Sequence, residues 1–335
     1  MQHVNIISVD NGAGLSRSIR ILSDILGHAG MRVTVSLTRA PSPLGGLTRA
    51  LSALPRPLAF RLGQLARSAH AWRRRRFDLN IFVEIIRPGW FPFARANCLI
   101  PNQEWFEDRW RRLLPQFDLV LCKTKAAQRI FSDLGCPTEY ISFTSPDRLN
   151  ESCARDYGLP FHLAGQSQQK GTKTVIELWL RHPEWPQLAI VQNPASAQQT
   201  TASNINHILA YLDDEALRRY QNTHGIHLCP SEAEGFGHCI VEAMSCKAVA
   251  IVTNAPPMNE IAAPERAVLV EYATCKPQNL GVNYHVDPRA LERRIDEVLG
   301  MDEAAKRQMG ERARAWYLEN DRFFRKRLVR VVTGI

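Results

Sequence analysis

The stretch of the chain best suited to chemistry runs from Cys229 to Ile261 and carries two glutamates and a glycine-rich loop. A strand is predicted to end near Cys229, the loop Glu234-Gly-Phe-Gly follows, and a helix is predicted over residues 238–245 with Glu242 inside it. Backbone N–H groups at a helix start favour a diphosphate. The two carboxylates can accept hydrogen bonds from hydroxyls at both ends of a ligand. A nucleotide-sugar has this layout, with ribose hydroxyls at one end, sugar hydroxyls at the other and a diphosphate between them.

A lysine earlier in the same half of the chain is the predicted partner of that diphosphate. The segment from His162 to Trp179 reads as a strand, a short loop and a Lys170-Gly171 pair that opens a helix. A cation beside a departing phosphate stabilises charge that grows in the transition state. The alternative is a surface lysine at a helix start, and Lys173 is a second, weaker candidate.

Four further candidates follow predicted strands in the first half of the chain. Gly12 and Gly14 belong to the first strand-to-helix turn, DNGAG, which either faces a ligand or serves only packing. Glu104 in NQEWF and Lys123 in CKT come after later strands, where open α/β sheets place ligands. We expect Glu104 to contact an acceptor and Lys123 to attract an anion, the alternative for both being a cap or a salt-bridge partner.

The elements that must position these residues form two α/β series. Strands are predicted at His3–Val9, 31–37, Leu79–Ile85, 96–101, Asp118–Cys122 and 138–142, with helices after the first strand, from Glu104, and from Lys125 to Leu134. A second series has strands at Pro160–Gly165, 187–192, 225–229, Ala248–Thr253 and 267–272. Alternating strands and helices indicate parallel sheets covered on both faces. We therefore predict Rossmann-like domains at 1–150 and 151–317, with a helix at 318–335 crossing back to the first.

The formal net charge of +9 predicts an anionic partner. No acidic residue occurs between Asp24 and Asp78, so the excess lies in a basic insert over residues 40–77. Within it, residues 47–76 place apolar side chains at helical spacing between arginines, a pattern typical of helices on anionic membrane surfaces. The alternative is a helix packed on the domain core. Nucleic acid is not predicted, because no recognised nucleic-acid module accompanies the arginines.

Composition also sets the expected compartment. No stretch reaches the roughly 18 apolar residues of a spanning helix, and the N-terminus lacks a signal-peptide pattern. The eight cysteines include no CxxC pair, which favours a reducing compartment and argues against zinc. We expect a cytoplasmic protein, peripheral to the inner face of the membrane if residues 47–76 bind it.

The motif around the two glutamates resembles a known family. Glu234 and Glu242, with seven residues between them, the EGFG loop, the EAM continuation and the AVAIVT strand are similar to the EX7E motif of retaining GT-B glycosyltransferases of the family-4 type, the glycosyl transferases group 1. The resemblance implies that Glu234 contacts the transferred sugar and Glu242 the ribose. It also implies that the backbone of Gly235, Phe236 and Gly237 and the loop carrying Asn259 and Glu260 border the donor. His238, next to this loop, is a candidate to orient the donor, the alternative being a core or cap residue.

One position departs from the family pattern. Gln166 stands where the family has an arginine that neutralises the diphosphate, so Lys170 has to supply more of that charge.

The resemblance implies a GT-B fold and metal-independent transfer from a nucleotide-diphosphate sugar to a glycan or lipid-linked acceptor, with retention, in the synthesis of surface polysaccharides or glycoconjugates. No cofactor or metal is expected. Two alternatives stay open: a nucleotide-sugar epimerase of similar fold, and a catalytically silent nucleotide-sugar-binding protein.

Overall fold

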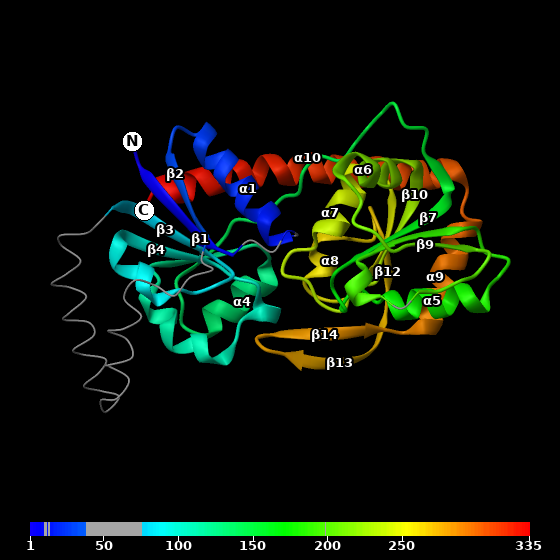
Figure 1. The fold of residues 1–335 in the computed structure, drawn as a ribbon, viewed down its shortest axis with the longest axis horizontal. Helices are drawn as coiled ribbons and strands as arrows, with labels where there is room; N and C mark the ends of the chain where they lie inside the picture. Colours follow the sequence, from blue (N-terminus) through cyan, green and yellow to red (C-terminus); the bar gives the residue numbers. More distant parts are fainter. Residues whose placement is uncertain (10–11, 13, 38–75, 198) are drawn as a thin grey trace.

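The computed structural model describes residues 1–9, 12, 14–37, 76–197 and 199–335. Two parallel six-stranded sheets lie side by side, each with its own helices (Figure 1). Apart from its last residues, the predicted basic insert lies outside the described residues, as does the membrane-surface helix proposed for 47–76, except Arg76.

The N-terminal sheet has the strand order β2-β1-β3-β4-β5-β6. Its strands are β1 (His3–Ser8), β2 (Arg32–Leu37), β3 (Phe77–Val83), β4 (Ala94–Ile100), β5 (Leu119–Cys122) and β6 (Thr138–Tyr140). Its helices are α1 (Gly14–His28) and α4 (Lys125–Asp133), with 3₁₀ helices η1 (Pro88–Phe93), η2 (Gln103–Trp105) and η3 (Asp108–Gln116). Leu79, Ile81 and Phe82 of β3 are fully buried, as the near-continuous apolar run predicts for a sheet covered on both faces.

The C-terminal sheet has the order β12-β11-β10-β7-β8-β9. Its strands are β7 (Asp156–Gly165), β8 (Leu188–Gln192), β9 (Ile205–Ile208), β10 (His224–Cys229), β11 (Val249–Thr253) and β12 (Val268–Val270). Its helices are α5 (Thr172–Arg181), α6 (Asp214–Thr223), α7 (His238–Ser245), α8 (Met258–Ile261) and α9 (Pro288–Gly300), with the 3₁₀ helix η4 (Pro194–Ser196). The fold class predicted from the sequence is therefore confirmed in its two parallel α/β sheets.

Strand order reverses once in each sheet. In the first sheet β1 lies between β2 and β3, and in the second β7 lies between β8 and β10. At such a point the loops leaving the carboxyl ends of adjacent strands diverge, and open α/β sheets bind ligands in the crevice between them. The loops after β7 and β10 carry Lys170 and Glu234 respectively.

A long helix and a hairpin join the two domains (Figure 1). Helix α10 (Glu303–Thr333) has 31 residues and so spans about 46 Å at 1.5 Å per residue. Its C-terminal part contacts the first domain, where Asn320 accepts a 2.6 Å hydrogen bond from Ser142 Oγ and Val332 O accepts one of 3.1 Å from Gln2 Nε2. The antiparallel hairpin β13 (Tyr272–Gln278) and β14 (Gly281–Val286) reaches η2 of the first domain.

The region after Glu104 and the hairpin differ from the sequence prediction, and strand β9 was not predicted. The helix expected from Glu104 is wrong, because the chain there forms two 3₁₀ helices, η2 and η3, and Pro115 inside η3 has no backbone N–H to donate to a longer helix. The hairpin was not predicted: β13 is exposed along most of its length and lacks the apolar alternation that marks a core strand.

The two domains share one apolar core. The Phe143 ring, just after β6, lies 5.6 Å from the Phe236 ring of the EGFG loop and 4.7 Å from the Phe324 ring of α10. All three residues are buried, so this is a closed arrangement in which the EGFG loop packs on the first domain. No helix among the described residues is long and apolar enough to cross a membrane.

Candidate active site between the domains

The centre of the site is an ion pair between Lys170 and Glu234. The two residues leave the carboxyl ends of the adjacent strands β7 and β10, and Lys170 Nζ contacts Glu234 Oε1. Their side chains are 19% and 11% exposed, so little solvent screens the pair. Burial alone lowers the pKa of Lys170, but Cys239 and Glu234 together raise it above the usual lysine value. Lys170 is therefore a permanent cation at the strand-order reversal.

The backbone at Gly171 fixes where that cation lies. Gly171 is the N-cap of α5 and has a left-handed backbone with φ +67°. A Cβ here would overlap the carbonyl oxygen of Pro230 and lie 3.3 Å from its carbonyl carbon. Only glycine satisfies both conditions, which explains the Lys-Gly pair in physical terms.

The EGFG loop is held against the first domain. A Cβ on Gly235 would overlap the side-chain amide of Asn102, and Glu234 O accepts a 2.9 Å hydrogen bond from Gln103 Nε2. Gly237, with φ 104°, is the N-cap of α7, which begins at the predicted residue. The loop thus brings Glu234 to the boundary between the domains.

His238 links α7 to two elements of the first domain. Its Nδ1 lies 2.7 Å from Ser145 Oγ and its Nε2 lies 3.3 Å from Ser18 Oγ. Burial lowers the pKa of His238 well below the usual value, so the ring is neutral. An added Cβ on Gly14 would lie 3.7 Å from the His238 ring, and Gly12 has φ +66°. Gly14 of the DNGAG turn thus lies on the side of the first domain that meets α7.

Glu242 is the second glutamate of the motif and is 1% exposed. One of its carboxylate oxygens pairs with Arg17 of α1, and the other accepts a 2.8 Å hydrogen bond from Gln221 Nε2 of α6. A ribose can reach this carboxylate only after Arg17 moves away. Arg17 was not predicted, because it is a charged residue on an ordinary amphipathic helix and no motif marks it.

A second charged cluster lies at the carboxyl ends of β3, β4 and β5. Asn102 donates to Glu84 Oε2 at 2.9 Å and accepts from Lys123 Nζ. Glu84 has φ 66°, an unusual conformation for a residue with a Cβ. Lys123 is 6% exposed, and burial lowers its pKa despite the neighbouring Glu104, Glu84 and Glu234. Lys123 and Glu104 were predicted as two independent candidate sites. Glu84 was not predicted as a site residue, although it directly follows the apolar strand β3.

The remaining sequence candidates lie outside this centre. The Gln166 side chain is exposed, and Lys173 is 90% exposed with an ion pair to Glu177 at 3.8 Å. Asn259 donates to Asn254 at 3.2 Å. Glu260 accepts 2.7 Å hydrogen bonds from the backbone of Lys125 and Ala126, so it caps α4 across the domain boundary. In this arrangement its carboxylate serves as an interdomain contact.

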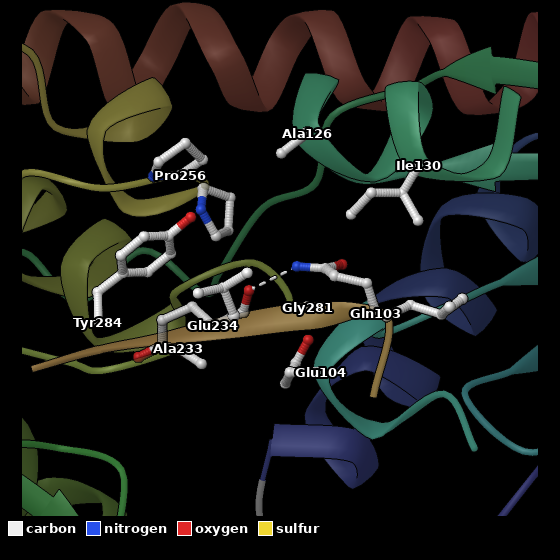
Figure 2. Close-up of a pocket in the computed structure, with 12 residues that line it drawn as sticks. Gln103, Glu104, Ala126, Ile130, Ala233, Glu234, Pro256, Gly281 and Tyr284 are labelled. Atoms are coloured by element: carbon white, nitrogen blue, oxygen red, sulfur yellow. Dashed lines mark hydrogen bonds between the residues drawn. The ribbon is translucent and has the colours of Figure 1, made fainter. Parts of the chain in front are cut away.

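A pocket of about 70 Å³ opens beside Glu234, between the domains (Figure 2). Gln103, Glu104, Ala126 and Ile130 line it from the first domain; Ala233, Glu234, Pro256, Pro257, Leu280, Gly281, Val282 and Tyr284 line it from the second. In this closed arrangement the pocket is smaller than a typical small-molecule site, and its lining is mostly apolar with few polar groups. Of the predicted residues, it brings together Glu234 and Glu104.

A metal site would need several His, Cys, Asp or Glu side chains close together. Within the described ranges, no three His, Cys, Asp or Glu side chains are grouped so that they could hold a metal ion. Metal independence stays a prediction.

Two Rossmann-like domains with a charged interdomain site define the class of the protein: it has the GT-B fold. The chain is similar to sucrose-phosphate synthase (tll1590) from Thermosynechococcus elongatus, with 16% identity over 100% of this chain and 98% of that one and a TM-score of 0.68. It is similar to Anabaena Alr3699/HepE, solved in complex with UDP and glucose, with 14% identity over 100% of both chains and a TM-score of 0.69. It is also similar to an α,α-trehalose-phosphate synthase (UDP-forming) from Burkholderia vietnamiensis, with 13% identity over 99% of this chain and 100% of that one and a TM-score of 0.63.

Sequence comparison points to one family. Residues 192–316 match the family model described as glycosyl transferases group 1, and this stretch contains Glu234 and Glu242. The match supports the group 1 resemblance for the C-terminal domain. No curated protein matches the chain by sequence at a significant level.

Proposed function

We propose that the protein transfers a sugar from a nucleotide-diphosphate sugar to an acceptor hydroxyl. The observation that carries the proposal is the buried Lys170–Glu234 ion pair at the strand-order reversal of the second sheet. It places a cation and a hydroxyl-binding carboxylate side by side at the boundary between the domains. The group 1 family match across Glu234 supports it, as do the UDP and UDP-glucose named for similar structures.

In this proposal the two members of the pair part when the donor binds. The diphosphate takes the place of Glu234 beside Lys170, and Glu234 turns to hydroxyls of the transferred sugar. Lys170 then stabilises the charge that develops on the leaving diphosphate, an effect commonly worth a few kcal/mol. The ribose binds Glu242 once Arg17 has moved, and Gly235, Phe236 and Gly237 border the phosphates with their backbone.

The proposal also covers the stereochemistry of transfer, the absence of a metal and the class of acceptor. We infer retention at the anomeric carbon and no metal from the EX7E resemblance, and a glycan or lipid-linked acceptor in surface polysaccharide or glycoconjugate synthesis from that resemblance and the basic charge. Binding to an anionic membrane surface rests on the composition of residues 47–76 alone.

A panel of nucleotide-sugars tested by thermal shift, followed by assay of nucleotide release, tests the proposal. We expect one donor to raise the melting temperature and to be turned over. Lys170→Ala should lower turnover about 100-fold or more, while Lys173→Ala, which removes the exposed lysine three positions along, should stay within about twofold of the wild type.

The outcomes separate the alternatives. A donor that binds and releases no nucleotide, with water or with any acceptor offered, indicates a silent binding protein. A donor whose sugar is isomerised while the nucleotide stays attached indicates an epimerase. Equal loss in the two lysine variants contradicts the assignment of Lys170.

A further inference from the structure

Two buried oxygen atoms in the interdomain pocket have no hydrogen-bond partner within the described part of the chain. They are Oε1 of Gln103 and Oε2 of Glu104, and each side chain belongs to a residue that is 3% exposed. Both residues line the pocket with Glu234 (Figure 2). A buried acceptor without a partner is energetically unfavourable, because it has lost its hydrogen bonds to water. The pocket therefore suits a ligand that brings O–H donors to these oxygens.

Both domains fix the position of these oxygens. The hairpin holds the η2 backbone, because Leu280 N donates to Gln103 O at 3.1 Å and Asn279 Nδ2 donates to Glu104 O at 2.7 Å. A Cβ added to Gly281 would lie 3.1 Å from Glu104 Cα. Gln103 in turn donates to Glu234 O at 2.9 Å. The acceptor oxygens and Glu234 thus belong to one hydrogen-bonded unit.

The charges around Glu104 suit proton transfer near neutral pH. The pKa of Glu104 is raised to about 8, and burial is the main cause. The charges of Glu84 and Glu234 raise this pKa further, whereas a hydrogen bond from its own backbone N–H and the charge of Lys123 partly offset the increase. Tyr284 of β14 is the other titratable side chain that lines the pocket. A general base works best when its pKa lies near the working pH.

We propose that this pocket is the acceptor subsite, and that Glu104 is a catalytic residue that takes the proton of the attacking hydroxyl while Gln103 Oε1 orients a neighbouring hydroxyl. The proposal rests on the glycosyltransferase function proposed above. It differs from the family-type step in which the leaving phosphate accepts that proton.

The proposed step involves the acceptor hydroxyl, Glu104, the anomeric carbon and the diphosphate. The acceptor O–H bond breaks and its proton moves to Glu104 Oε2, while the acceptor oxygen forms a bond to the anomeric carbon. The bond from that carbon to the diphosphate oxygen breaks, and its electron pair stays on the diphosphate beside Lys170. Glu104 then releases the proton to water.

The apolar part of the lining indicates the kind of acceptor. Ile130, Pro256 and the ring of Tyr284 also line the pocket and contribute apolar surface to it. The C–H face of a sugar ring packs on such surface while its hydroxyls donate hydrogen bonds. The acceptor class is thus a saccharide or another polyhydroxylated alcohol.

Hydrolysis of the donor tests Glu104 without knowledge of the acceptor, because water then serves as the attacking O–H. The probe is UDP-glucose, or the panel nucleotide-sugar that gives the largest thermal shift, and nucleotide release is measured from pH 6 to 10. We expect the wild-type rate to rise with pH through about 8 as Glu104 loses its proton.

Three variants separate the roles. Glu104→Gln should lower turnover about 100-fold or more and remove the rise with pH, with donor affinity within threefold of the wild type. Glu84→Gln removes a charge that raises the pKa of Glu104, so the rise should move to lower pH. Glu107→Gln changes a half-exposed carboxylate three positions along and should leave both rate and profile unchanged.

Failure of the proposed glycosyltransferase function and failure of the proposed role of Glu104 give different results. Wild-type protein that releases nucleotide from none of the donors overturns the proposed function, and this inference with it. Wild-type turnover whose pH profile persists in Glu104→Gln and does not move in Glu84→Gln overturns the role of Glu104 alone. The Glu84→Gln shift stays informative even if Glu104→Gln does not fold.

Discussion

Replacing Gly171 with alanine tests whether this glycine sets the position of Lys170. The left-handed backbone at φ +67° costs an L-residue roughly 1–2 kcal/mol. The overlap of the new Cβ with the Pro230 carbonyl adds the cost of overpacking, typically 1–3 kcal/mol. The expected total is about 3 kcal/mol, and because backbone is the obstacle, the loop bearing Lys170 has to shift.

Gly135 provides the matched control. It has φ +79°, and an added Cβ would meet no atom within 4 Å, so Gly135→Ala carries the backbone cost alone. At about 2–4 °C per kcal/mol, we expect a fall in melting temperature of roughly 2–8 °C for Gly135→Ala and 6–12 °C for Gly171→Ala. Thermal unfolding by circular dichroism measures both.

Turnover adds a second readout. Gly171→Ala should lower nucleotide release from the bound donor at least about tenfold at a temperature where the variant is folded, because Lys170 is displaced. Gly135→Ala should leave it unchanged. Equal destabilisation of the two variants, or full activity in Gly171→Ala, would refute the reasoning.

Three other predictions concern the site and its supports. Glu242→Ala should weaken nucleotide binding, whereas Glu234→Ala should mainly reduce turnover. Calorimetric titration measures the binding and nucleotide release measures the turnover. If both variants behave like the wild type, the assignment of these two glutamates to the site is wrong. Burial lowers the pKa of His162 from 6.5 to about 4, so below pH 6.5 this residue binds fewer protons in the folded protein than in the unfolded chain. The contribution of His162 to the free energy of unfolding should therefore fall by about 3 kcal/mol as pH drops from 6.5 to 4. Thermal midpoints across that range should drop less in His162→Gln, and identical slopes would contradict this. Glu260→Ala removes the carboxylate that accepts from the first two backbone N–H groups of α4, beside the N-cap Thr124, and should cost about 1 kcal/mol. An unchanged melting temperature would show that this contact does not hold the domains together.

The parts of the fold that were predictable are those with strong local patterns. Buried strands such as β3 and β10 read as apolar runs, and α7 begins at the predicted His238 because glycines precede it and helical spacing follows. The hairpin was not predictable in the same way. Its stabilising contacts, from Asn279 and Leu280 to η2, join residues far apart in sequence and leave no periodic signal.

The candidate site shows the same division. Glu234, Lys170 and Glu104 were predicted because each follows a strand, and the structure brings Glu234 together with both of the others. The partners of Glu242 were out of reach, because Arg17 is a helix residue whose contact depends on how the domains close. Glu260 was expected to border the donor through its position in the loop, but the side chain turns to the helix start of the first domain.

The most direct test of the central claim is a crystal structure of the complex with the nucleotide-sugar that gives the largest thermal shift. We predict a diphosphate within hydrogen-bonding distance of Lys170 Nζ, with the carboxylate of Glu234 released from the lysine and accepting from a sugar hydroxyl. A nucleotide bound elsewhere, with the two side chains still joined, would contradict it.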